Sequence, residues 1–264
     1  MVSNKIILEG IEIVDLCLYL IEQNTLILGD LHIGYEDTLK SKGFLVPKQQ
    51  LKLTKTRILK IIEFIKKKYS INLIEKIIIN GDLKHEFGII QKSEWKETLE
   101  LIDLLTIKCQ EVIVIKGNHD KIIQPILSKR NIKVKEYFLI QKAHKDPKSK
   151  DNNKILLCHG DQVPEEAENA QTIIIGHEHP AIKLKQYPRT EVYKIFVKTR
   201  WNNKILIVMP SFNLLSKGSN ILEMKFLSPF LNTNHSNKKE IIELFVVSDK
   251  KIFNFPDLNF ISID

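Results

Sequence analysis

The sequence contains little cysteine and no long apolar segment. Its three cysteines, Cys17, Cys109 and Cys158, lie far apart, so they have neither zinc-site nor disulfide spacing. No apolar run among the 264 residues approaches the roughly 20 residues that a membrane-spanning helix requires. The first residues, MVSNK, lack the basic and then apolar layout of a signal peptide. We therefore expect a cytoplasmic protein without a membrane partner.

Acidic residues are also fewer than basic ones. The chain has 32 Asp and Glu against 40 Lys and Arg, which gives a formal net charge of +8. A positive excess favours an anionic partner such as nucleic acid. Here the excess is mostly lysine on the faces of predicted helices, in a chain also rich in Ile and Asn, which indicates a general composition bias. The charge therefore permits nucleic-acid binding without arguing strongly for it.

Short apolar runs rich in β-branched residues recur along the chain, and each ends near a glycine and a group of Asp, Asn or His. Runs of this length bounded by turn residues are typical of buried strands in an α/β sheet. They lie at 25–29, 77–80, 112–115, 155–158 and 172–175. Helical periodicity connects the first three, with one helix from Pro47 to Tyr69 and another from Ser93, as N-cap, to Ile107. This alternation predicts parallel βαβ units.

The remaining segments have the patterns of strands and loops. We expect two or three strands within 5–20, and further strands at 132–140, 154–158, 172–175, 192–198, 204–209, 241–248 and 251–255. Loops are expected at 33–46, 141–153 and 228–240. No segment has the length and composition of a linker, so we expect residues 1–264 to form a single α/β domain with two sheets.

The polar residues that end the apolar runs have the chemistry of metal ligands. Because ligands bind at the carboxyl ends of the strands in such sheets, we expect these residues to meet at one edge. They are Asp30, His32, Asp82, Asn118, His119, His159, His177 and His179. Carboxylates, imidazoles and one Asn carbonyl, without thiolates, suit Mn²⁺, Fe or Zn²⁺. So many ligands exceed the needs of one ion but suffice for two ions that share a bridging carboxylate.

Five sequence blocks, in the same order, resemble the signature of the calcineurin-like metallophosphoesterases. The blocks are Gly29-Asp30-Leu31-His32, Gly81-Asp82, Gly117-Asn118-His119-Asp120, His159 and Gly176-His177-Glu178-His179. The runs at 81–85 and 210–213 further resemble the ICC-like, SbcD-related phosphoesterases of archaea and bacteria. The resemblance implies an α/β four-layer sandwich, in which two mostly mixed β-sheets are flanked by helices and the metals lie at the carboxyl edge of the strands.

The resemblance also implies a role for each matching residue. Asp30, His32 and His179 would hold one metal ion, Asn118, His159 and His177 would hold a second, and Asp82 would bridge the two. The cofactors would be two divalent metal ions, foremost Mn²⁺ with Fe, Zn or Ni as alternatives, and a hydroxide that bridges them would attack the substrate. His119 would stabilise or protonate the leaving oxygen, and Asp120 would orient a neighbouring group.

The chain departs from the family pattern after Asp82. Many members have Gly-Asp-x-x-Asp where this chain has Gly81-Asp82-Leu83-Lys84-His85. The missing carboxylate is usually not a metal ligand, so we expect metal binding to persist. Lys84 and His85 could instead contact the substrate phosphate. Asp161, which follows His159 closely, is expected to support the ligand histidines, with simple solvation as the alternative.

Two functions of different classes are compatible with these residues. The first is hydrolysis of phosphodiester bonds in a phosphate-ester substrate, with nucleic acids or nucleotides as candidates. The second is a non-catalytic scaffold that has kept the fold, lost the chemistry and binds a protein partner. Degeneration of that kind should erase the leaving-group histidine or several ligands, whereas His119 and every expected metal position are present. The sequence therefore favours the metal-dependent phosphoesterase.

Overall fold

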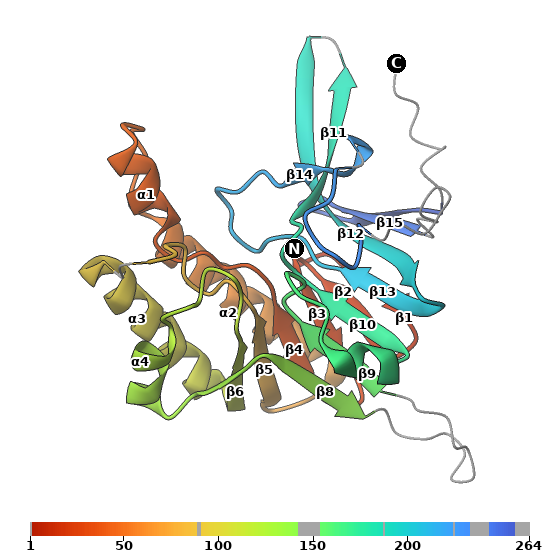
Figure 1. Ribbon diagram of the computed structural model, residues 1–264, viewed down its shortest axis with the longest axis horizontal. Coiled ribbons are helices and arrows are strands. Elements are labelled where there is room, and N and C mark those ends of the chain that lie inside the picture. Colours follow the sequence, from red (N-terminus) through yellow and green to blue (C-terminus); the bar gives the residue numbers. More distant parts are fainter. Residues whose placement is uncertain are drawn as a thin grey trace.

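Two β-sheets pack against each other, and α-helices cover the outer side of one of them (Figure 1). The computed structural model describes residues 2–88, 91–141, 154–186, 188–223, 225–232 and 243–256. One apolar cluster contains side chains from both sheets, for example Ile78 of the first and Phe196 and Ile207 of the second, so the main core lies between them. None of the helices in the described part of the chain is long and apolar enough to cross a membrane.

The first sheet joins an antiparallel meander to a parallel half, in the order β1-β2-β3-β4-β5-β6-β7. The meander consists of β1 (Asn4–Leu8), β2 (Ile11–Val14), β3 (Cys17–Leu20) and β4 (Thr25–Leu28). In the parallel half, β4 pairs with β5 (Ile74–Asn80), β5 with β6 (Cys109–Ile115), and β6 with β7 (Lys133–Lys135). β4 is buried on both faces, which explains why its sequence is apolar without alternation.

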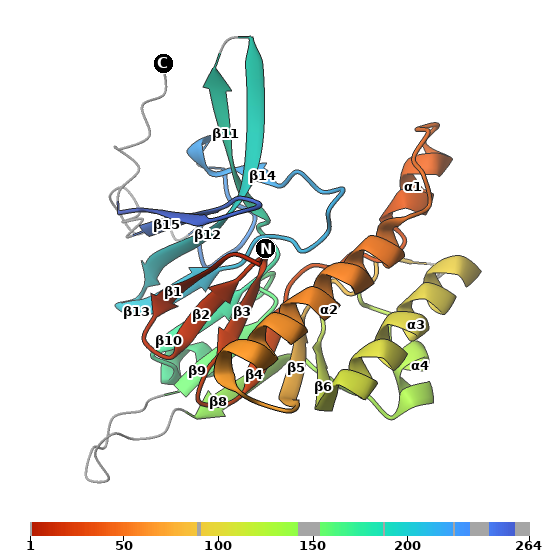
Figure 2. The ribbon, with the colours of Figure 1, turned by 180° about the vertical axis from the view of Figure 1, so that it is seen from behind.

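Helices connect the parallel strands and bury one face against them (Figure 2). The short α1 (Tyr35–Ser41) and the long α2 (Gln50–Tyr69) link β4 to β5, and α3 (Lys92–Lys108) links β5 to β6. Four isoleucines at helical spacing in α2 are buried in the core: Ile58, Ile61, Ile62 and Ile65. α4 (Gln124–Leu127) and the 3-10 helix η1 (Ser128–Arg130) precede β7. These crossovers leave the carboxyl ends of β4, β5 and β6 at the same edge of the sheet.

The second sheet is also mixed, in the order β14-β11-β12-β13-β10-β9-β8, with β15 paired to β12 and β16. Its strands are β8 (Tyr137–Gln141), β9 (Lys154–Cys158), β10 (Thr172–Ile175), β11 (Pro180–Gln186), β12 (Arg189–Trp201), β13 (Lys204–Val208), β14 (Ser219–Asn220), β15 (Glu243–Val247) and β16 (Ile252–Phe255). β9, β10 and β13 are parallel, so β9 and β10 also end at a common edge. The β11–β12 hairpin extends beyond the body of the molecule (Figure 1).

A second apolar cluster covers the outer face of this sheet. It combines Leu156 and Ile173 with residues of η2 (Glu165–Asn169), η3 (Ile221–Glu223) and the segment 225–232. The α-helices of the described chain all precede residue 128, so this fourth layer consists of 3-10 turns and loop. The two mixed sheets flanked by helical elements confirm the expected fold class.

Several local expectations need correction. The expected loop at 33–46 contains α1, the long helix begins at Gln50 rather than near Pro47, and the N-cap of α3 is Gln91 rather than Ser93. The expected strand at 132–140 is two strands, β7 and β8, that belong to different sheets. β11 was not expected, and β12 is longer than the expected 192–198. Residues 142–153 and 233–242, which hold most of two expected loops, lie outside the described residues.

Candidate active site

The candidate ligands lie where strands of both sheets end. Asp30 and His32 follow β4, Asp82 follows β5, and Asn118 follows β6, whereas His159 follows β9 and both His177 and His179 follow β10. Five of them adopt left-handed backbone conformations: Asp30 (φ 47°), His32 (45°), Asp82 (49°), His177 (64°) and His179 (48°). This conformation costs energy for a residue with a side chain and persists where the surroundings impose it. Its concentration at these residues indicates a functional site.

Three glycines let the ligand loops approach one another closely. A Cβ on Gly81 would lie 2.1 Å from Nδ1 of His159, and one on Gly117 would lie 2.2 Å from Oδ1 of Asp82. A Cβ on Gly176 would lie 2.5 Å from Oδ2 of Asp30. Each contact joins a loop to a ligand from a different strand. Glycine is therefore required at these positions for the ligands to meet.

A first group of donor atoms comes from Asp30, His32, His179 and Asp82. Oδ1 of Asp30 lies 3.1 Å from Nε2 of His179, which in turn lies 3.2 Å from Nε2 of His32. Nε2 of His32 lies 3.6 Å from Oδ2 of Asp82. Ligands held about 2.1 Å from one cation are about 3.0–3.5 Å from each other. The spacing of this group fits a divalent cation.

A second group of donors comes from Asn118, His159, His177 and again Asp82. Oδ1 of Asn118 lies 3.0 Å from Nε2 of His159 and 3.1 Å from Nδ1 of His177. The two imidazole nitrogens are 3.2 Å apart, and Nε2 of His159 lies 3.4 Å from Oδ2 of Asp82. Oδ2 of Asp82 therefore lies within ligand distance of both groups.

The buried charge of the site also fits a cation. Asp30 is fully buried, and its Oδ2 has no hydrogen-bond partner in the described residues. An unpartnered buried carboxylate oxygen is costly unless a cation or another donor compensates it. Burial raises the pKa of Asp30, but His179 and His159 outweigh burial and lower this pKa below its ordinary value. Burial also raises the pKa of Asp82, but its hydrogen bond to His159 and the charge of that ring outweigh burial and lower it. The carboxyls of Asp30 and Asp82 are thus held in the ionised form that binds metals.

The surroundings shift the pKa values of two candidate ligand imidazoles in opposite directions. Burial, followed by the charge of His179, lowers the pKa of His32 to about 3. Burial also opposes the charged form of His159, but Asp82 and Asp30 outweigh it and raise its pKa to about 9. His159 is thus the imidazole that must release a proton when it binds a metal.

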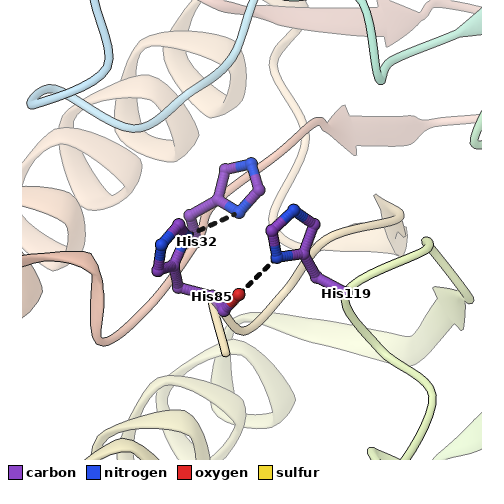
Figure 3. Close-up of side chains that lie close together, drawn as sticks. All are labelled: His32, His85 and His119. Atoms are coloured by element: carbon purple, nitrogen blue, oxygen red, sulfur yellow. Dashed lines mark hydrogen bonds between the residues drawn. The ribbon is translucent and has the colours of Figure 1, made fainter. Parts of the chain in front are cut away.

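His119 lies at the edge of the cluster. Its backbone N–H donates to Oδ1 of Asp82 at 3.0 Å, and its Nδ1 donates to the carbonyl of His85 (Figure 3). This bond assigns the ring proton to Nδ1 and leaves Nε2 to face Oδ2 of Asp82 at 3.8 Å. His119 therefore presents a second ring nitrogen toward the donor groups while its own orientation is fixed.

His85 and Lys84 lie very differently, although they are adjacent. The half-buried His85 ring has its Nδ1 at 3.5 Å from Nδ1 of His32, and nitrogens of His32, His85 and His119 form a third close group (Figure 3). Lys84 is fully buried, and its ammonium donates to the carbonyls of Glu86 and His119. Contrary to our expectation, Lys84 is thus not presented to a substrate; it joins the loops that carry His85 and His119.

Two buried carboxylates hold these loops in place. Asp120 accepts N–H hydrogen bonds from Gly117, Leu83 and Lys84. Glu94, in the first turn of α3, accepts from the N–H groups of His85 and Glu86 at 2.9 Å each. Sequence analysis could not single out Glu94, because a Glu in the first turn of a helix is common at exposed positions.

A cavity of about 200 Å³ adjoins the second donor group. Its lining includes Asn118 and His159, together with Lys116, Lys121 and the half-buried Asp161. Asp161 therefore lies beside the ligands without a described hydrogen bond to them. Cys158 is buried with the outer apolar cluster, as expected from alternation along β9.

The sequence matches the model of a known protein family. The profile of that family matches residues 24–234, so the chain belongs to the calcineurin-like phosphoesterase family. The crystal structure of the nuclease MPE from Pseudomonas putida is similar over 97% of this chain and 100% of that chain, with 17% identity and a TM-score of 0.57. The crystal structure of Vps29 from Entamoeba histolytica in complex with zinc is similar over 88% of this chain and 96% of the Vps29 chain, with 16% identity and a TM-score of 0.34. The comparison with curated proteins gives no match.

Proposed function

We propose that this protein is a phosphodiesterase with a binuclear metal centre that hydrolyses nucleic acids or nucleotides. The observation that carries the proposal is the position of Asp82. Its Oδ2 lies 3.6 Å from Nε2 of His32 in the first donor group and 3.4 Å from Nε2 of His159 in the second. Such a carboxylate oxygen, placed between two sets of ligands, can be shared by the two metal ions of a hydrolytic site.

The residues divide into two ligand sets with Asp82 in common. Asp30, His32 and His179 would hold one ion, and Asn118, His159 and His177 the other. We propose Mn²⁺, because imidazole, carboxylate and amide ligands without thiolate suit it, with Fe, Zn and Ni as alternatives. When bound, the two ions would activate water and neutralise charge on the phosphoryl oxygens.

His119 would act on the leaving group. Its Nδ1–H donates to the carbonyl of His85, so Nε2 is the nitrogen that faces the site. In the imidazolium form of His119, Nε2 would give its proton to a departing alkoxide, and Nδ1 would keep its own. His85 lies on the same side, and we propose that it contacts the substrate beside the leaving oxygen. The Lys84 ammonium donates to the carbonyls of His119 and Glu86, which joins the loop that carries His119 to the loop that carries His85.

The family and its nuclease neighbour support the choice of substrate. A calcineurin-like phosphoesterase is expected to act on a phosphate ester, and the similar fold of the Pseudomonas nuclease makes a polynucleotide a candidate. The resemblance to ICC-like, SbcD-related enzymes points in the same direction. The three cysteines are free and buried, in keeping with our proposal of a cytoplasmic protein.

The test is hydrolysis of bis-p-nitrophenyl phosphate by metal-stripped protein reloaded with Mn²⁺. We expect turnover that EDTA abolishes and that His119→Ala reduces by about 100-fold or more, in the range of lost general acid catalysis. Lys129→Ala, which alters a side chain packed over Trp95 in α3, serves as a control and should be active. Metal analysis should give two ions per chain. A chain that binds no metal would instead support the scaffold that binds a protein partner.

A further inference from the structure

Aromatic rings line the side of the site on which His119 lies. Tyr35, the first residue of α1, packs against His85 with ring centroids 4.5 Å apart. The His85 and His119 rings are stacked at 5.3 Å, and the Phe87 ring lies 3.6 Å from that of His119. We call Tyr35, His85 and Phe87 the aromatic wall. Together with the His119 ring, which lies between those of His85 and Phe87, they form one continuous row from α1 to the loop after β5.

Phe87 is the exposed end of this wall. The residue is 51% exposed, although its ring contacts that of the proposed proton donor. Exposure alone is ordinary, because Phe44 and Phe253 are exposed as well. Phe87 differs in that its exposed ring contacts the proposed proton donor, beside the position where a leaving group would depart. Any group released next to His119 would therefore meet an aromatic surface.

Two other roles would account for fewer of these observations. The Phe87 ring could serve only to shield His119 from water, but a Leu would shield it equally well. His32, His85 and His119 could together hold an ion, but His32 would then bind it through Nδ1 while its Nε2 serves the first donor group, which requires an imidazolate. Neither use requires a row of rings that reaches from the reaction centre to α1. Sequence-tolerant binding of unpaired bases uses exposed aromatic rings beside a phosphate-binding site.

We propose that the aromatic wall stacks an unpaired nucleobase on the leaving-group side of the scissile phosphate. The inference rests on the proposed function and narrows its substrate to single-stranded or unpaired polynucleotide. A base in a duplex is covered by its neighbours and cannot offer its face to Phe87. The net charge of +8 adds attraction for the phosphate backbone but does not distinguish single strands from duplexes.

The test compares two strands that differ only in their bases. A fluorescent oligothymidylate and an abasic deoxyribose strand of equal length carry the same phosphate charge. Both are made with phosphorothioate linkages and titrated into Mn²⁺-loaded protein, and again in EDTA. Stacking of one base should make the thymidylate bind about 5- to 150-fold more tightly than the abasic strand.

Substitutions at Phe87 then test whether its ring causes the tighter binding of the thymidylate. Phe87→Ala and Phe87→Leu should bring thymidylate binding to the level of the abasic strand, whereas Phe87→Trp should keep the difference. Tyr35→Leu tests the far end of the wall and should reduce the preference in part. Because position 87 is exposed, the three Phe87 variants should retain the wild-type melting temperature.

Each outcome decides between the wall and its alternatives. Equal binding of the two strands by wild-type protein would overturn the inference, as would a Phe87→Ala variant that weakens both strands alike. Turnover of bis-p-nitrophenyl phosphate judges the proposed function separately. Turnover without a base preference would refute only base stacking on the aromatic wall. A base preference without turnover would refute only the proposed phosphodiesterase activity.

Discussion

The glycines that precede the candidate ligands in the sequence are not equivalent in the structure. Substitution by alanine should therefore have different effects at Gly29 and Gly117. At Gly29, before Asp30, an added Cβ would meet the side chain of Met209 at 3.6 Å, which is ordinary van der Waals contact. At Gly117, before Asn118, it would lie 2.2 Å from Oδ1 and 2.4 Å from the backbone N of Asp82. Neither glycine has a positive φ, so the comparison isolates steric overlap.

The size of the effect follows from these distances. Ordinary contact begins near 3.4 Å, so Gly117→Ala requires Asp82 and residue 117 to separate by about 1 Å. A backbone nitrogen cannot swing aside as a side chain can, and functional groups tolerate displacements of only about 0.5 Å. The shift also strains the 3.0 Å hydrogen bond from the His119 N–H to Asp82. Overpacking of this kind costs about 1–3 kcal/mol, or about 2–12 °C in melting temperature.

Thermal unfolding in EDTA and calorimetric titration with Mn²⁺ measure the two consequences separately. Gly117→Ala should melt lower without metal and should bind Mn²⁺ at least about 10-fold more weakly, because the shared carboxylate is displaced. Gly29→Ala should match the wild type in both measurements. The reasoning fails if Gly117→Ala behaves as the wild type, or if both variants are impaired equally.

Three other predictions concern the surroundings of the ligands. Burial holds the pKa of His32 near 3, so between about pH 3 and 6.5 the unfolded chain binds more protons than the folded one. The free energy of unfolding should therefore fall as pH falls through this window. In urea unfolding with EDTA, His32→Asn should reduce this pH dependence by up to about 1.4 kcal/mol per pH unit. Asp120→Ala leaves three backbone N–H groups without their acceptor and should cost about 3–5 kcal/mol in urea unfolding, and an unchanged midpoint would contradict this. Glu94→Ala should lower kcat/KM for bis-p-nitrophenyl phosphate about 10-fold or more with Glu94→Gln less affected, whereas equal loss in both would argue against a role in holding the loop.

The positions of the candidate ligands at one edge could be predicted because they depend on local pattern and one topological rule. Each apolar run became a buried strand, and parallel strands bring their carboxyl ends to one edge. Pairing partners could not be predicted in this way. β7 and β8 are separated only by Glu136, yet one pairs with β6 and the other with β9, because non-local packing rather than local pattern selects the partner. The extent of the domain, residues 1–264, stays a prediction.

The surroundings of the candidate ligands were harder to predict than the positions of these residues. Lys84 follows two residues after Asp82 in a ligand-rich motif, which favoured a substrate contact, but its ammonium is buried against the carbonyls of Glu86 and His119. α1 has only seven residues and no sustained apolar periodicity, so its sequence resembled a loop. Phe87 lies in a short segment whose pattern gives no sign that its ring meets that of His119.

The site depends on the packing of the two sheets, because neither sheet contains a complete donor group. The first group takes His179 from the second sheet, and the second takes Asp82 and Asn118 from the first. The donor spacings of 3.0–3.6 Å are therefore set by the core between the sheets, where Phe196 and Ile207 pack with residues of the first sheet. Cations bound between them would in turn stabilise the folded chain over the unfolded one, which has no assembled site. Metal affinity and the stability of the sheet interface should thus change together, even for substitutions in the core that contact no ligand.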